Sequence, residues 1–222
     1  MPPGSPSSGS RTPTPAALGE EVLGAIEVHL RQRELRREEL YQQARRLRRQ
    51  AQRTMTRLHL GTSEAPELAS VRTGLRELSE RIRRDGRADE PLVHDALQEA
   101  VEASLLGAIV AREALPGPAD LAVDPEPYLL GLGDVVGEIR RRVLDRLGRD
   151  DLPGAEAELA LMERLTQALL RFDTTRAIVP LKPKQDTARA LLERTRGEVV
   201  MARHLVRVRG HAVEPPPTKE EG

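Results

Sequence analysis

Four carboxylates are notable because they lie in otherwise apolar stretches. Glu99 and Glu102 occur within LQEAVEASLL, and Asp134 and Glu138 within YLLGLGDVVGEI. Spacings of three and four residues place each pair on one face of a helix. Because both segments are apolar nearly all round, these acids are expected in a buried or groove-lining position rather than on a solvated face.

Metal binding is the chemistry that such a cluster favours. Carboxylates brought together raise each other's pKa, and a divalent cation relieves the repulsion. All-oxygen sites favour Mg²⁺ or Mn²⁺, which can activate water against a phosphodiester. Asp95, four residues before Glu99, could join the cluster. Either pair alone is more typical of a solvated helix face. Together they predict metal-ligating and catalytic roles for four residues: Glu99, Glu102, Asp134 and Glu138.

Two other chemistries are weaker fits. A di-iron bundle normally needs a glutamate three residues before a histidine on two helices, and none of the five histidines has one. Metal-free RNA cleavage would need two histidines to meet, and isolated helical histidines are more often ordinary surface or core residues. The candidates for such a pair are His29, His59, His94, His204 and His211.

A run of arginines provides a candidate nucleic-acid surface. From Ala44 to Ser63 there is no acid, and an apolar seam is predicted to pack the same helix through Leu40, Ala44, Leu47, Ala51, Met55 and Leu58. A helical projection places the arginines opposite this seam. A stripe of one sign suits a polyanion, although an exposed arginine-rich helix is the alternative. We call this set the arginine stripe: Arg45, Arg46, Arg48, Arg49, Arg53 and Arg57.

The elements that position these residues are all predicted to be helical. Period-two alternation is missing, so no strand is expected. Proline and glycine punctuation predicts six helices, in a body of six or seven: 16–60, 66–84, 91–115, 127–148, 153–171 and 185–208. The first is unusually long. Three glycines within Gly131–Gly137 weaken a helix interior, which predicts close approach of another helix or of a ligand backbone.

Composition limits the remaining classes. The 222 residues carry 35 acids and 35 bases, so a binding surface requires segregated charge. Without cysteine, disulfides and thiolate chemistry are excluded. With no signal peptide or membrane span, a cytoplasmic location is expected. Residues 1–15 and 213–222 read as disordered tails around one helical domain at 16–212.

Three segments resemble the translin family, especially its nuclease member, translin-associated factor X. Residues 127–139, PYLLGLGDVVGEI, resemble the YLLGxADLTGEL signature. Residues 97–103, LQEAVEA, resemble LQEYVEA, and residues 205–210, LVRVRG, resemble the closing LKVRG. Their order and approximate spacing agree with the family over about residues 20–210.

The resemblance implies a seven-helix fold in a hollow, usually octameric homo-oligomeric shell. It implies single-stranded RNA or DNA bound inside and Mg²⁺-dependent endoribonuclease activity. The family's catalytic carboxylates map onto the same four acids, and its nucleic-acid contacts onto the arginine-rich first helix. The sequence departs from the family's motifs at two places that bear on substrate preference and metal affinity. The aromatic residues after LQEYVEA are replaced by Ser104–Gly107, and Gly133 and Val136 replace an alanine and a threonine.

Two further functional classes stay open at this stage. A non-catalytic single-strand-binding shell would use the acids only for packing or ion storage, and would show salt-sensitive binding without metal-dependent cleavage. A purely structural helical assembly protein would show no affinity for nucleic acid at low salt.

Overall fold

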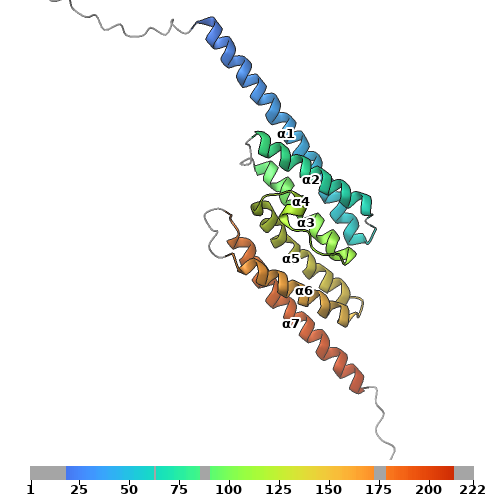
Figure 1. Ribbon diagram of the computed structural model, residues 1–222. Helices are drawn as coiled ribbons and strands as arrows, with labels where there is room; N and C mark the ends of the chain where they lie inside the picture. Colours follow the sequence, from blue (N-terminus) through green and yellow to red (C-terminus); the bar gives the residue numbers. More distant parts are fainter. Residues whose placement is uncertain (1–18, 63, 86–90, 173–178, 213–222) are drawn as a thin grey trace, which may run out of the picture.

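The computed structural model describes residues 19–62, 64–85, 91–172 and 179–212, with side chains to residue 208. Seven helices follow one another in this part of the chain (Figure 1). They are α1 (Glu20–Leu60), α2 (Ala65–Asp85), α3 (Pro91–Ala111), α4 (Pro118–Leu121), α5 (Pro125–Leu147), α6 (Leu152–Leu170) and α7 (Lys182–Ala212). The described residues form no strand, so the all-α prediction is confirmed. None of these helices is both long and apolar enough to span a bilayer.

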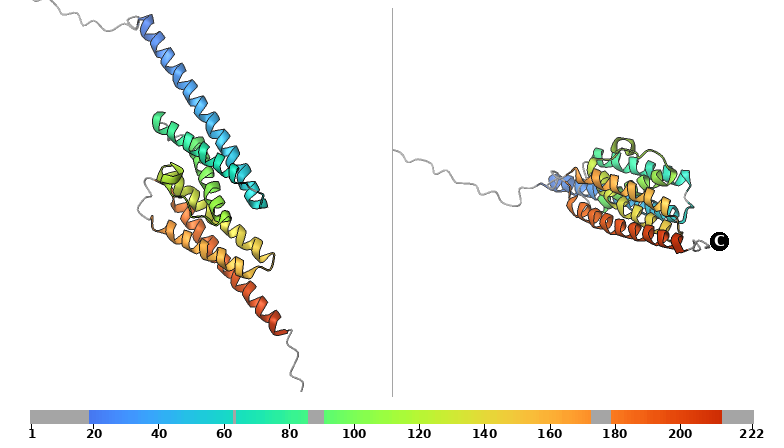
Figure 2. Two further views of the ribbon diagram at one scale, coloured as in Figure 1. Left: turned by 45° about the vertical axis from the view of Figure 1, so that its right-hand side comes forward. Right: turned by 90° about the horizontal axis from the view of Figure 1, so that it is seen from below.

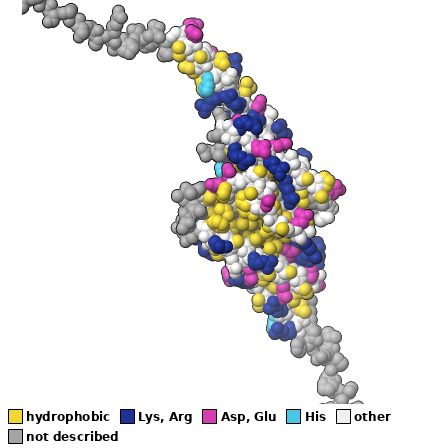
Figure 3. All heavy atoms as spheres, in the orientation of Figure 1, with side chains coloured by type: hydrophobic (Ala, Val, Ile, Leu, Met, Phe, Trp, Pro, Cys, Tyr) yellow, Lys and Arg dark blue, Asp and Glu magenta, His cyan; other side chains and the backbone are white. Residues whose placement is uncertain are grey.

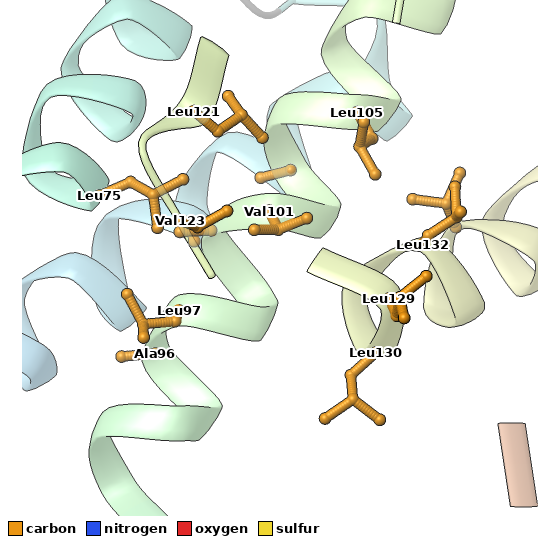
Figure 4. Close-up of a cluster of buried hydrophobic side chains, with 14 of the residues drawn as sticks. Leu75, Ala96, Leu97, Val101, Leu105, Leu121, Val123, Leu129, Leu130 and Leu132 are labelled. Atoms are coloured by element: carbon orange, nitrogen blue, oxygen red, sulfur yellow. The ribbon is translucent and has the colours of Figure 1, made fainter. Parts of the chain in front are cut away.

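Helix α3 lies at the centre because it is the most uniformly apolar. It packs against α1, α2 and α5, while α5 in turn packs against α6 and α7. Figure 4 shows Leu97, Val101 and Leu105 of α3 between Leu75 of α2 and Leu132 of α5. The two acid-bearing helices are therefore direct neighbours in the core.

The glycines of α5 permit this approach, as the sequence predicts. A Cβ on Gly131 would lie 2.8 Å from Val101 Cγ1 and 2.9 Å from the Gln98 carbonyl oxygen, both in α3. A Cβ on Gly133 would lie 3.0 Å from Lys184 Cβ at the start of α7. Helix packing on both sides of α5 thus requires residues without side chains.

Both ends of the bundle extend beyond the core. The first half of α1, up to Glu39, is exposed, and its buried seam begins at Leu40. The end of α7 also projects from the body, at the opposite end of the molecule (Figures 1 and 2). Both extensions carry exposed apolar side chains, among them Val22, Leu23, Ile26, Val200, Met201 and Leu205.

Several predicted boundaries were wrong. The third helix ends at Ala111, not residue 115, because Arg112 adopts a left-handed conformation (φ 59°) where the chain leaves the core. Helix α4 was not predicted, and α5 begins two residues earlier than expected, at Pro125. Helix α7 starts at Lys182 and continues past Gly210.

The long first helix and its apolar seam are confirmed, with Met55 half-buried and the other five residues buried. The predicted tails, 1–15 and 213–222, lie outside the described residues, as do residues 16–18 of the predicted first helix.

Candidate functional site

The four predicted acids come together between α3 and α5. Glu99 and Glu102 lie one turn apart on α3, and Asp134 and Glu138 one turn apart on the facing side of α5. All four are partly buried. We call them the carboxylate cluster. Asp95 is exposed and is not among the charged groups that affect Glu102.

Glu102 is the member of the carboxylate cluster whose ionisation is least favourable. It forms no ion pair with any described residue. Burial raises the pKa of its carboxyl from 4.5 to about 8, with further contributions from the charges of Asp134, Glu138 and Glu99, and Lys184 opposes them. Ionising Glu102 would therefore add a negative charge that no described ion pair compensates, which is the situation that a divalent cation relieves.

The other three acids each contact a basic side chain. Arg48 Nε donates to Glu99 Oε1 at 2.7 Å, and Lys184 pairs with Asp134. His59 Nε2 lies 2.6 Å from Glu138 Oε2. Gln98 also donates to Asp134 Oδ2, at 2.5 Å. No three His, Asp or Glu residues of the described chain converge closely enough to hold a metal ion.

Sequence reasoning missed most of these partners. Lys184 was not singled out, although it is one of only three lysines in the chain. His59 was considered only for a histidine pair. The signal that could have found it is helical spacing, because His59 lies eleven residues, three turns, after Arg48 on the same side of α1.

The arginine stripe is divided by the fold, which corrects the prediction of a single outward face. Arg48 turns toward Glu99 on the flank of α1, and Arg57 pairs with Glu67 of α2 at 2.5 Å. Arg45 lies near Glu38 at 3.7 Å. Acids from other helices and from an upstream turn thus neutralise part of a run that has no acid of its own. Three members are exposed and form no ion pair with a described residue: Arg46, Arg49 and Arg53.

A cleft of about 290 Å³ opens beside the carboxylate cluster, between the C-terminal ends of α1 and α5. His59 lines it, and so do four arginines: Arg141, Arg142, Arg146 and Arg149. Arg141 Nη1 donates to His59 Nδ1 at 3.0 Å. Since Nδ1 accepts this bond, Nε2 carries the proton that His59 donates to Glu138.

Comparisons with known proteins agree with this architecture. The sequence matches no protein-family model. It is 31% identical to an uncharacterised protein of Methanocaldococcus jannaschii over 181 residues, 79% of this chain and 80% of that protein.

Among solved structures, AfC3PO in complex with duplex RNA is 31% identical with a TM-score of 0.73, covering 82% of this chain and 97% of that one. A crystal structure of AfC3PO is 30% identical, with a TM-score of 0.72 and the same coverage. Apo-NeC3PO, 18% identical over 81% of this chain and 96% of that one, shares the fold with a TM-score of 0.71. The helix order, the long first helix and these identities show that the chain belongs to the translin/C3PO family.

Proposed function

We propose that this protein binds RNA within a translin-like homo-oligomer and cleaves it as an endoribonuclease that depends on Mg²⁺ or Mn²⁺. The carboxylate cluster carries the proposal. Partly burying four acids between two packed helices costs stability, and a carboxyl pKa raised by burial and by neighbouring charges is typical of a functional site. The likeness to AfC3PO, solved with duplex RNA, supports RNA as the ligand.

The donors fit a hard divalent cation by their chemistry. All four are carboxylates, and Glu102 lacks a counter-charge. Glu99, Glu102, Asp134 and Glu138 would hold the ion once their side chains turn toward one another, because no three of them converge in the described structure. Arg48 and Lys184 balance the charges of Glu99 and Asp134 without it, and His59 donates a hydrogen bond to Glu138. A bound divalent ion would supply Lewis acidity toward the phosphodiester and lower the pKa of water.

The chain's own groups can orient the acids and hold a proton. Gln98 and Lys184 bind the two oxygens of Asp134 and so fix the plane of its carboxylate. His59 Nε2 donates to one oxygen of Glu138, Oε2. In the metal-free site, burial raises the pKa of Glu102 to about 8, so its carboxyl holds a proton at neutral pH and would release it on ligating the ion.

RNA binding is assigned to the unpaired arginines of the arginine stripe, Arg46, Arg49 and Arg53, which lie on the exposed side of α1. With no aromatic residue among them, contacts should be to backbone phosphates and weakly dependent on sequence. Single-stranded RNA is the substrate that the sequence predicts, with single-stranded DNA as a possible ligand, whereas AfC3PO was solved with duplex RNA. Both forms of RNA belong in the assay.

Oligomerisation is supported by the two apolar extensions. Ile26 on α1 and Met201 on α7 are 47% and 60% exposed, and neither extension is covered by described residues of the same chain. Contiguous exposed apolar surface marks an interaction site. We assign both extensions to contacts between copies of this chain, with an octamer expected from the family.

The test is cleavage of labelled RNA, single-stranded and duplex, with Mg²⁺, with Mn²⁺ and with EDTA. The Glu102→Gln variant should bind RNA normally and lose metal-dependent cleavage. The matched control is Glu77→Gln, which removes an exposed acid of α2 that forms no ion pair with a described residue, and it should cleave like the wild type. Equal cleavage by wild type and Glu102→Gln would refute the catalytic assignment.

A non-catalytic RNA-binding shell is the second candidate. It is favoured by the partners already present on three of the four acids, which make the cluster a self-contained link between helices. Salt-sensitive RNA binding without cleavage in either metal, the same for Glu102→Gln and wild type, would select it.

A further inference from the structure

One side of α5 changes sign along its length. Asp134 and Glu138 belong to the carboxylate cluster, and Arg141 follows three residues later on the same side of α5, whereas Arg149 lies in the turn just after the last helical residue, Leu147. Both arginines line the cleft beside the cluster. A strand that follows this side of α5 would pass from the acids directly to these cations.

The four arginines of the cleft have different roles. Arg142 and Arg146 both contact Glu158, a buried acid of α6. Arg146 also binds Asp151, which caps α6 by accepting from the Gly154 amide at 2.9 Å. These two arginines therefore hold α5 against α6 and form the inner wall of the cleft.

Arg141 and Arg149 are exposed and form no ion pair with a described acid. Arg141 donates only to His59, and Arg149 has no side-chain partner in the described chain. Two acids of the lining reduce its positive charge: Asp145, which lies between these arginines in the sequence, and Asp151. Four arginines against two aspartates leave a net charge of +2 on the lining, before Glu158 behind it is counted.

We propose that this cleft is a phosphate subsite, in which Arg141 and Arg149 bind a backbone phosphate of the RNA strand adjacent to the one at the carboxylate cluster. A single side chain, His59, separates the two sites, with Glu138 on one nitrogen and Arg141 on the other. Guanidinium groups suit phosphate oxygens because they offer paired donors in a plane. The inference rests on the proposed RNA binding and assigns the position of the strand.

The subsite also has a mechanical consequence for the site. Arg141 is shared between the cleft and His59, so a phosphate bound to Arg141 would lie one side chain away from Glu138. A strand seated in both sites is thus held in one register, which is the positioning that phosphodiester hydrolysis requires.

The experiment measures the affinity of the full chain for a short single-stranded RNA in EDTA, where cleavage does not interfere, over a range of salt concentrations. Arg149→Gln is the first variant because Arg149 does not contact His59 or the carboxylate cluster. Losing one phosphate contact reduces the slope of log K against log salt by about 0.7, which is roughly fivefold in affinity at 0.1 M salt. The matched control is Arg164→Gln, at an exposed arginine of α6 outside the cleft that forms no ion pair with a described residue.

The decisive arm replaces one phosphate at a time by a neutral methylphosphonate. In the wild type, one position next to the scissile phosphate should weaken binding about fivefold, and in Arg149→Gln the same replacement should have no further effect. Melting temperatures check that each variant is folded. The subsite would be overturned, with RNA binding intact, if Arg149→Gln and Arg141→Gln both bound RNA as tightly as the wild type. It would also be overturned if the affinity lost through the methylphosphonate simply added to the affinity lost through Arg149→Gln. No salt-dependent binding by the wild type would refute the proposed function and the subsite together.

Discussion

Replacing Glu102 by glutamine should stabilise the metal-free protein, and more so at higher pH. The Glu102 carboxyl is partly buried, has no cationic partner, and faces three other acids across α3 and α5. Glutamine keeps the shape of the side chain and removes the charge. The comparison therefore isolates the cost of ionising this one group, because every other titrating residue is present in both proteins.

The magnitude follows from the pKa of the folded and unfolded states. The folded protein retains the Glu102 proton up to about pH 8, whereas the ordinary pKa is 4.5. Between these values the folded state binds more protons than the unfolded state, so the free energy of unfolding of the wild type falls as pH rises. If the whole pKa shift counted toward stability, ionising Glu102 would lower the free energy of unfolding by roughly 5 kcal/mol. Water screens the charge of this partly exposed carboxyl, so we expect the free energy of unfolding to fall by about 2 kcal/mol.

The assay is urea unfolding in EDTA, followed by helical circular dichroism, at intervals from pH 5 to pH 9. The stability of Glu102→Gln relative to wild type should rise by about 2 kcal/mol up to pH 8 and then level off. Glu77→Gln should show no such trend. A difference between Glu102→Gln and wild type that stays constant over the whole range would refute the reasoning, since the glutamine would then act through packing alone.

Three further predictions test the fold and the RNA surface. Gly131→Ala should cost about 2 kcal/mol in urea unfolding because its Cβ would overlap α3, whereas Gly197→Ala, with open space around it, should stabilise by about 0.5–1 kcal/mol. Glu158→Ala, which removes the acid that Arg142 pairs with and leaves Arg146 only Asp151, should destabilise by about 3 kcal/mol, and Glu193→Ala, on the surface, by under about 0.5 kcal/mol. Replacing the three unpaired arginines of the arginine stripe by glutamine should reduce the salt slope of RNA binding by up to about 2, measured by fluorescence anisotropy.

The helices and the facing acids could be predicted because they depend on local pattern. Apolar residues at spacings of three and four along α1 marked its buried seam, and acids inside the apolar α3 and α5 indicated a groove rather than a free surface. The glycines Gly131 and Gly133 indicated close packing before the neighbours were known. Each of these signals lies within a few turns of one helix.

The partners of the acids could not be predicted because they are separated widely along the chain. Arg48 and Glu99 are 51 residues apart, Lys184 and Asp134 are 50 apart, and His59 and Glu138 are 79 apart. Which arginines of α1 face solvent depends on where α3 and α2 cross it, and helical periodicity alone does not determine that. Helix α4 could not be predicted for a different reason, because Pro118–Leu121 is too short to show a helical period.

The partners also explain why a costly acidic site is compatible with a stable fold. Arg48 and His59 belong to α1 and Lys184 to α7, whereas the acids belong to the central pair α3 and α5. Each contact therefore ties an outer helix to the core while it neutralises or satisfies one acid. Among the four acids, only Glu102 has no such contact with a described residue, so no ion pair offsets the free-energy cost of ionising it in the folded protein. A cation that neutralises ionised Glu102 should therefore raise the free energy of unfolding most at high pH. The single variant Glu102→Gln then tests stability, metal affinity and cleavage together.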